Sequence, residues 1–443
     1  MTHPVVRLTR ATLTLALRIF FRRVELEGIE RVPQSGPLIF VLNHPNGLID
    51  PVFLLCLAPR PVSYIAKATL FSMPVVGWLV RAFDSLPVQR KQDRATGTDN
   101  SETFDRAREL LSRGGSLGIF PEGISHNEPQ LQRLKTGAAR IAFGTGLADL
   151  KIVPAGLYYS DKAIFRSEAL VLFGEPIEVV PVALGEDGEA PREQVRELTA
   201  KIEVALGEVT LQADAHEALA LVDRAARILD AAGDPSQSLG DGVALRRRLA
   251  AGYERLREEA PAEVEVLTER LGDYEGSVGA LGLDIDHPPG EALSAGLILR
   301  IGLLTLLTLL LLAPLAVVGT LIHYPAYRLV GHLSRRFSGG EDDLLATIKV
   351  LGSLLFFPLS WGVVAIAAAL LGGGAWVALA VGLLAPLTGF VALNFWERFE
   401  GLVGGARIAW VWLTRRSVLE RLSRERQAIY DGIVDLAARL DDV

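Results

Sequence analysis

The sequence predicts an α/β protein in which a sheet is flanked by helices, followed by an acidic helical region and a C-terminal α-helical membrane module. Over 31–180, short apolar runs alternate with helical stretches, which is typical of strands covered by helices. The composition is 50% hydrophobic and the mean hydropathy is +0.30, a high value for a soluble chain of 443 residues. Two long segments near the C-terminus carry no Asp, Glu, Lys or Arg, which indicates where the chain meets a membrane.

Composition also excludes several classes of protein. The single cysteine, Cys56, rules out an internal disulfide framework and any multi-cysteine metal site, and it fits a reducing compartment. The histidines show no clustering of the kind that ligates a metal, so no metal is expected. The formal net charge of −7 argues against a nucleic-acid-binding protein.

Residues 1–30 are predicted to form a basic helix that lies in the membrane interface. Residues 1–23 contain no acidic side chain, and an apolar core is flanked by arginines that share one helical side, namely Arg7, Arg10, Arg18 and Arg22. A signal peptide is the alternative, but Arg18 interrupts its hydrophobic region and no small-residue cleavage site follows.

The α/β domain is expected over 31–185. Its apolar runs predict strands at 37–44, 115–120, 151–159 and 169–179, with helices at 51–58 and 131–146.

An acidic helical region is expected over 186–295. The stretch Pro181–Gly290 holds 11 Lys/Arg and 23 Asp/Glu, so the rest of the chain is mildly basic, as suits a protein facing anionic lipid. Runs rich in Ala, Leu, Glu and Arg predict solvated helices at 191–231 and 242–271. No chemistry is evident in this region, and a scaffold or partner-binding role stays open.

The membrane module is expected over 296–400, followed by an amphipathic helix over 401–443. The stretch Val350–Trp396 has 47 uncharged residues, enough for two spans of about 20 residues that turn at Gly372-Gly373-Gly374. Five of the six tryptophans lie in or just after it, where an interfacial belt is expected. Basic residues at both ends place those ends on the cytoplasmic side.

The shorter uncharged stretch, Ile301–Tyr324, has 24 residues and is predicted to be a re-entrant or interfacial helical hairpin. Pro314 lies in its middle, and basic residues flank both of its ends, so a full span would leave one basic flank outside. A third membrane span is the alternative.

A candidate acid–base pair follows the first predicted strand, in the sequence Asn43-His44-Pro45-Asn46-Gly47-Leu48-Ile49-Asp50. The Asp50 carboxylate can hold one imidazole nitrogen of His44 as N–H, which leaves the other free to accept a proton from an attacking hydroxyl. The spacing alone is common, and a structural loop histidine is the simpler interpretation.

A second cluster, Phe120-Pro121-Glu122-Gly123, follows the predicted strand at 115–120. Neighbouring strand ends in an α/β sheet face one crevice, so the two clusters are expected to meet. Between them in sequence lies Ser85-Leu86-Pro87-Val88-Gln89-Arg90-Lys91, a basic element suited to a phosphate.

Together these residues resemble the glycerolipid acyltransferase superfamily, which includes glycerol-3-phosphate and 1-acylglycerol-3-phosphate acyltransferases. The family pattern of NH-x4-D, a GxxFIxR-like block, FPEGTRS and a late VP block is similar to NHPNGLID, SLPVQR, FPEGISH and Val153-Pro154 here. Five residues rather than four separate His44 from Asp50, and Ile124-Ser125-His126 replaces Thr-Arg-Ser. Both departures resemble fungal-type acyltransferases that use glycerol-3-phosphate or dihydroxyacetone phosphate, and their bacterial relatives.

The resemblance implies transfer of a fatty acyl group from acyl-CoA or acyl carrier protein to a glycerol hydroxyl in phospholipid synthesis, without a cofactor. It implies a general base in His44 oriented by Asp50. Residues implied in substrate binding are Arg90, Pro121, Glu122, Gly123, His126 and Lys135, with Arg133 as a further substitute for the missing arginine. Residues implied in supporting the motifs are Asn43, Phe120 and Pro154. Membrane lipids are the expected partners, and the expected location is a bacterial-type cytoplasmic membrane with the catalytic domain on the cytoplasmic side.

Three other functions are compatible with parts of the sequence. The sequence Gly114-Gly115-Ser116-Leu117-Gly118 matches the G-x-S-x-G of serine hydrolases, but Ser116 enters a predicted strand instead of leaving one. A lysophospholipid-remodelling acyltransferase fits the same motifs. A non-catalytic membrane scaffold built on a degenerate domain is disfavoured because His44, Asp50 and Glu122 are all present.

Overall fold

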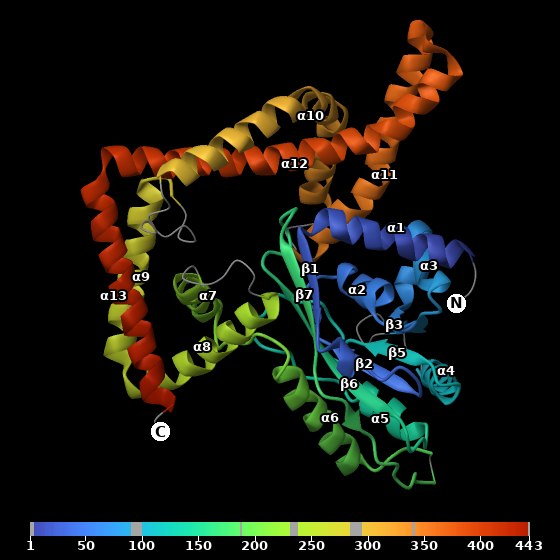
Figure 1. Cartoon of the computed structure of the whole chain (residues 1–443). Helices are drawn as coiled ribbons and strands as arrows, with labels where there is room; N and C mark the ends of the chain where they lie inside the picture. The colour runs from blue at the N-terminus through green and yellow to red at the C-terminus, as the bar shows by residue number, and fades with distance from the viewer. Residues whose placement is uncertain are drawn as a thin grey trace. The chain divides into compact units, whose positions relative to one another are not determined.

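The computed structural model describes residues 4–89, 100–186, 188–230, 238–283, 295–338 and 342–441. The chain divides into two compact units (Figure 1). The sheet unit comprises Met1–Ala215, Ser238–Val243 and Gly340–Val350, and the helical unit comprises His216–Gln237, Ala244–Gly339 and Leu351–Val443. Each unit is described separately below.

The sheet unit contains an eight-stranded sheet, counted over the described residues, with the order β1-β7-β6-β2-β5-β3-β4 and with β8 paired to β6. The strands are β1 (Arg23–Glu27), β2 (Leu38–Leu42), β3 (Ser63–Lys67), β4 (Leu86–Val88), β5 (Ser116–Ile119), β6 (Lys151–Tyr159), β7 (Glu168–Phe173) and β8 (Ile177–Glu178). Pairing is parallel except where β6 meets β7 and β8. All five residues of β2 are buried, as befits a central strand covered on both faces.

Helices cover this sheet (Figure 1). They are α1 (Pro4–Phe20), α2 (Ile49–Leu57), α3 (Pro74–Ala82), α4 (Ser101–Ser112), α5 (Gly137–Gly144) and α6 (Arg192–Gly207), with the short 3₁₀ turns η1 (Ile29–Arg31) and η2 (Ala68–Ser72). One buried core joins β2 and β5 to α4, α5 and α6. The predicted α/β class and its four strands are confirmed, although the last predicted strand is interrupted.

Several predicted boundaries differ from the structure. The helix expected over 1–30 ends at Phe20, and Arg23–Glu27 forms strand β1 of the sheet. The helix expected at 131–146 begins only at Gly137, because the amide groups of Gln132 and Lys135 donate to Glu122 and Pro121 and so hold this backbone in a loop. The strand expected at 169–179 breaks after Phe173, where the Gly174 amide turns to donate to the carbonyl of Pro154 at 2.9 Å.

The sheet unit also extends beyond the predicted boundary at residue 185. Helix α6, assigned from its charge to the acidic region, buries an apolar stripe in the core of the sheet, made of Val195, Leu198, Ile202 and Leu206. Its polar positions carry three acidic and three basic side chains, and the apolar stripe at helical spacing determines where it packs.

In the helical unit, helices that precede and follow the apolar segments pack together. They are α7 (His216–Asp230), α8 (Leu239–Glu259), whose first residues belong to the sheet unit, α9 (Pro261–Ala280) and α13 (Arg416–Asp441). Leu271 and Tyr274 of α9 share a buried core with Ile429 and Ile433 of α13. Arg270 adds an ion pair to Glu425 at 2.8 Å.

The apolar helices are α10 (Ala295–Phe337), α11 (Asp342–Ala368) and α12 (Gly374–Thr414), with the turn η4 (Ala369–Gly373) between α11 and α12. Two stretches, Gly302–Phe337 and Leu345–Thr414, are long and apolar enough to cross a membrane. The predicted turn is confirmed: Gly372 and Gly374 adopt φ of 91° and 69°, in the left-handed region that favours glycine. Figure 1 shows α11 and α12 meeting at this tip.

The hairpin expected within 301–324 is wrong, because α10 is one continuous helix that contains Pro314 and Pro325. Its interior packs against the other apolar helices of the unit. The Trp361 indole donates to His323 at 2.8 Å, and the Trp396 indole donates to the Thr320 hydroxyl at 3.0 Å. Proline is tolerated inside such a helix where neighbouring helices and polar side chains compensate for the lost hydrogen bond.

Candidate active site

The loops after β2 and β5 meet at one edge of the sheet, as the sequence predicts. The two strands are parallel neighbours, with Val41 opposite Ile119. Two residues beyond β2, the His44 ring stacks on Phe120, with centroids 3.9 Å apart and planes 14° apart. Tyr64 of β3 stacks on Phe120 as well, at 5.4 Å. The apolar stack holds the imidazole in one plane at this edge of the sheet.

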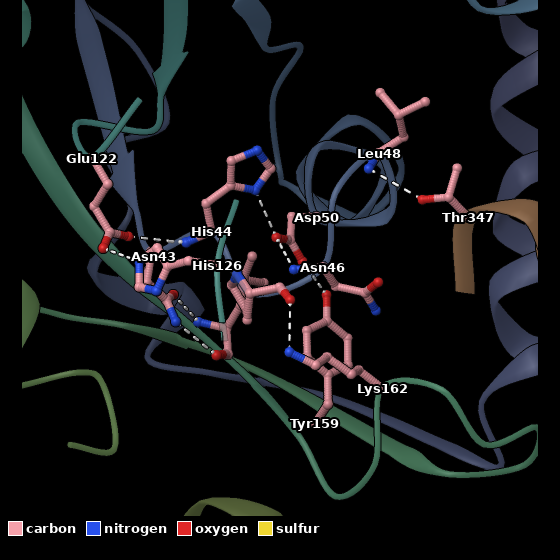
Figure 2. A network of polar contacts seen from close by, with 12 residues as sticks. Asn43, His44, Asn46, Leu48, Asp50, Glu122, His126, Tyr159, Lys162 and Thr347 are labelled. Atoms are coloured by element: carbon pink, nitrogen blue, oxygen red, sulfur yellow. Dashed lines mark hydrogen bonds and ion pairs between the residues drawn. The ribbon is translucent and has the colours of Figure 1, made fainter. Parts of the chain in front are cut away.

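His44 and Asp50 form the predicted pair (Figure 2). Nδ1 of His44 lies 2.8 Å from Oδ2 of Asp50, a carboxylate with no exposed surface at the first turn of α2. Because the carboxylate only accepts, Nδ1 carries the hydrogen and Nε2 presents a lone pair. Over the described residues, no hydrogen bond occupies Nε2, and the His44 side chain is 12% exposed.

Asp50 has two further donors, neither of which the sequence identified. The backbone amide of Asn46 donates to Oδ2 at 2.7 Å, and the hydroxyl of Tyr159 donates to Oδ1 at 2.6 Å. Tyr159 ends β6, so its position at the end of a predicted strand is the one sequence signal that could have found it. Three donors, including Nδ1 of His44, therefore hold this buried carboxylate in one orientation.

Backbone and amide contacts hold the loop that connects His44 to Asp50. Asn43 exchanges two hydrogen bonds with the backbone of Leu157, at 2.7 and 3.1 Å, which fixes the end of β2 against β6. Gly47 adopts φ of 39° where the chain turns into α2. Lys162 donates to the carbonyl of Pro45 at 3.1 Å. The predicted supporting role of Asn43 therefore has a physical basis in this reciprocal pair.

Glu122 joins the two loops from inside the protein (Figure 2). It is 2% exposed, and its Oε1 accepts from the backbone amide of His44 at 3.2 Å. Its Oε2 accepts from the backbone amide of Gln132 at 2.7 Å and from Nε2 of His126. Nδ1 of His126 accepts from the amide of Glu128 at 3.2 Å, so this imidazole is the neutral tautomer with its hydrogen on Nε2.

The remaining predicted residues surround these contacts. The Lys135 amide donates to the carbonyl of Pro121 at 2.8 Å, and its side chain lies over Gly123, where a Cβ would overlap Nζ. Gly123 has φ of 73°, a second reason for glycine at this position. Pro154 lies in β6 opposite Val41. Arg90 falls outside the described residues, so its predicted role stays a prediction.

Burial governs the titration of the tyrosines beside the pair. It raises the pKa of Tyr64 and of Tyr159 well above 10, and the nearby Asp50 carboxylate raises both further. The Tyr159 hydroxyl therefore stays a hydrogen-bond donor through the neutral range. Burial also raises the pKa of the Cys56 thiol to about 11. Among the described residues, no group of three or more His, Cys, Asp and Glu side chains could hold a metal ion.

Two families match separate parts of this chain. Residues 23–158 match the family described as Acyltransferase, and these residues contain His44, Asp50 and Glu122. Residues 222–441 match the family described as Glycerol-3-phosphate acyltransferase 2 C-terminal domain. Each match covers less than half of the chain, and the descriptions of both families name acyltransferases.

Individual relatives agree with that class. Glycerol-3-phosphate O-acyltransferase 1 of Saccharomyces cerevisiae is 26% identical over 77% of this chain, and glycerol-3-phosphate O-acyltransferase 2 of the same yeast is 32% identical over 59%. These matches cover 58% and 37% of the two yeast proteins. The chloroplastic 1-acyl-sn-glycerol-3-phosphate acyltransferase LPAT1 of Arabidopsis thaliana is 30% identical over 35% of this chain and 44% of its own length.

One solved structure is similar in part. It is the 1-acyl-sn-glycerophosphate acyltransferase PlsC of Thermotoga maritima, at 21% identity and a TM-score of 0.34, over 46% of this chain and 78% of that one.

Proposed function

We propose that this chain is a membrane-associated O-acyltransferase. It moves a fatty acyl group from an acyl thioester, acyl-CoA or acyl carrier protein, to a hydroxyl of glycerol-3-phosphate or 1-acylglycerol-3-phosphate. The observation that carries the proposal is the His44–Asp50 pair: Nδ1 is held at 2.8 Å by a buried carboxylate, while Nε2 keeps its lone pair at the sheet edge. The names of the matched families and relatives supply the acceptor class.

In the proposed reaction, Nε2 of His44 removes the proton of the acceptor hydroxyl as its oxygen attacks the thioester carbonyl carbon. The C–O bond forms, the C–S bond breaks, and the departing thiolate takes the proton from the imidazolium. Asp50 stays ionised and stabilises the imidazolium through Nδ1, at the distance of 2.8 Å that already exists. General-base catalysis of this kind contributes about 10²–10⁴ in rate.

The acceptor phosphate needs cations near the pair. Lys135 is exposed and its ammonium lies over Gly123, in the loop that follows β5. We assign it, together with Arg90, to the phosphate of the acceptor. Glu122 and His126 are engaged with one another and with backbone amides, so their contribution is to hold the two loops in register.

The membrane provides the surface on which the product is released. Large apolar side chains are exposed along the apolar helices, including Leu370 at 83%, Leu371 at 89% and Trp376 at 83%. In α1, Leu8 and Leu15 are exposed at 69% and 59% beside its arginines. These faces fit a lipid environment. The proposed orientation places the catalytic domain on the cytoplasmic side of a bacterial-type membrane.

The test uses the full chain in detergent, with acyl-CoA or acyl carrier protein as donor and a panel of acceptors, read out by mass spectrometry. Glycerol-3-phosphate, dihydroxyacetone phosphate, 1-acylglycerol-3-phosphate and larger lysophospholipids make up the panel. His44→Ala should lower turnover by about 10²–10⁴ without weakening membrane association. His216→Ala, at the exposed start of α7, is the matched control. Wild-type turnover in His44→Ala would refute the proposed mechanism.

A further inference from the structure

The first turns of α11 belong to the sheet unit, although they lie about 300 positions away in sequence from the loop that they contact. Unit boundaries assign Gly340–Val350 to the sheet unit. Within this segment Ala346, Thr347 and Val350 are buried, with exposed fractions of 0%, 4% and 4%. A buried threonine is informative, because its hydroxyl needs a hydrogen-bond partner.

Thr347 contacts the loop that connects His44 to Asp50, which we call the catalytic loop (Figure 2). The backbone amide of Leu48 donates to Oγ1 of Thr347 at 3.2 Å. Two residues further along, the segment has a second attachment, because Nζ of Lys349 donates to the carbonyl of Ala163 at 2.6 Å. Ala163 follows Lys162, whose ammonium donates to the carbonyl of Pro45 in the same loop.

The backbone amide of Leu48 needs a hydrogen-bond acceptor from outside helix α2. Leu48 is the residue immediately before α2, and its own side chain cannot cap the helix. Amide groups at a helix start have no partner within the helix and are satisfied by side chains, water or another segment. Here the Thr347 hydroxyl supplies an acceptor two residues before Asp50, so the contact fixes the turn that aims the carboxylate at His44.

We propose that Thr347 is a positioning residue for acyl transfer, supplied to the catalytic loop by the C-terminal family region. The inference rests on the proposed function, in which His44 and Asp50 carry the reaction. It assigns a role to a residue that lies within 222–441, outside the acyltransferase-family match at 23–158. Since α11 continues into the uncharged stretch that starts at Val350, the same helix that enters the apolar module also orders the catalytic loop.

The decisive variant is Thr347→Val, which keeps the β-branched shape and removes only the hydroxyl. Hydrogen–deuterium exchange of the full chain in detergent should show faster exchange at the Leu48 amide. Turnover should fall about three- to tenfold with the KM of the acceptor unchanged, as expected for one lost hydrogen bond that orients a reacting group. Thr347→Ser restores the hydroxyl and should return both values toward wild type.

Thr308→Val is the matched control, because among the described residues this helical threonine donates to its own helix, at the carbonyl of Leu304. Unchanged exchange at Leu48 in Thr347→Val would overturn the inference, as would faster exchange with wild-type turnover. A parallel rise in KM, or no rescue by serine, would also overturn it. Hydrogen–deuterium exchange at Leu48 can be measured whether or not the protein transfers acyl groups. A failure of the proposed function is therefore distinguishable from a failure of the proposed role of Thr347.

Discussion

Tyr159 donates its hydroxyl hydrogen to one oxygen of Asp50 at 2.6 Å, while the other oxygen of that carboxylate lies 2.8 Å from His44. The carboxylate is therefore held at both ends. Two strands, β2 and β6, bring these residues together across more than a hundred positions of sequence. The orientation of the imidazole depends on this arrangement as much as on Asp50 itself.

Replacement of Tyr159 by phenylalanine should lower turnover about tenfold, because a hydrogen bond to a charged group contributes about 1.5–3 kcal/mol and its loss lets the carboxylate rotate. The ring remains and keeps its packing with Phe21 and Phe53. Steady-state kinetics of Tyr159→Phe measure the effect, with Tyr253→Phe in α8 as control. Wild-type turnover in Tyr159→Phe would show that the His44–Asp50 pair needs no such support.

Stability should fall as the pH rises above about 10. Burial raises the pKa of Tyr64 and Tyr159 above 10, so the unfolded chain loses these two protons near pH 10 while the native chain retains them. Above that pH the native state binds more protons than the unfolded state, and the free energy of unfolding decreases. Below about pH 9 the two states bind equal numbers and these groups have no effect.

Thermal unfolding followed from neutral to alkaline pH measures this dependence. Tyr159→Phe removes one of the two groups, so its melting temperature should decline less steeply above about pH 10 than that of the wild type. If the melting temperatures of the two proteins decline equally with pH, the raised pKa of Tyr159 is contradicted.

Loss of His126 should affect stability more than acceptor binding. Both of its ring nitrogens are occupied, by Glu122 and by the amide of Glu128. His126→Ala leaves Glu122 buried with one donor fewer, which should lower the free energy of unfolding by about 1–3 kcal/mol. The double variant with Glu122→Gln should be less stable still, because the glutamine NH2 group would face the backbone amide of either His44 or Gln132. Denaturant unfolding measures both, and a raised acceptor KM with unchanged stability would instead support the binding role implied by the sequence.

Gly123 and Gly114 form a matched pair for testing the loop after β5. Both have φ of 73°, but a Cβ at Gly123 would overlap Lys135, whereas nothing lies within 4 Å of one at Gly114. Gly114→Ala should cost about 1–2 kcal/mol from the left-handed backbone alone. Gly123→Ala should cost slightly more, because the end of the flexible Lys135 side chain must move aside, and Lys135→Ala should remove that small excess. Equal unfolding free energies for the two glycine variants would exclude the steric contribution.

Cysteine labelling can establish which side of the membrane each end of the apolar module faces. The one native cysteine, Cys56, is buried with a pKa of about 11, so it should label slowly at neutral pH. Leu371→Cys at the exposed turn between α11 and α12 should label from the outside, and Arg421→Cys in α13 should label only after the membrane is opened. Labelling of both from one side would contradict a two-span hairpin.

The sequence was sufficient to predict the parts of the site that lie next to their strands. His44, Phe120 and Glu122 follow buried apolar runs, and their convergence follows from the rule that neighbouring parallel strands end at one edge. His44 and Asp50 lie six positions apart at the start of a helix, so their contact is nearly local.

Contacts that come from remote segments could not be predicted in the same way. Tyr159 and Thr347 approach the loop from 109 and 299 positions away in sequence, and one chain contains no local signal for such pairs. In two further segments, contacts with remote residues determine the structure in place of the local sequence pattern. The segment 131–136 has a helical pattern, but its amides serve the loop after β5. Helix α6 lies within the acidic stretch of the sequence, but its apolar stripe packs in the core of the sheet.

The contact between α9 and α13 restricts the number of times that the chain can cross a bilayer. One helix precedes the apolar module and the other follows it, yet they share a buried core and the Arg270–Glu425 ion pair. Two helices joined in this way occupy the same aqueous compartment. The chain between Ala280 and Arg416 must therefore cross an even number of times. If α11 and α12 cross as a pair, α10 begins and ends on the same side despite its 43 residues.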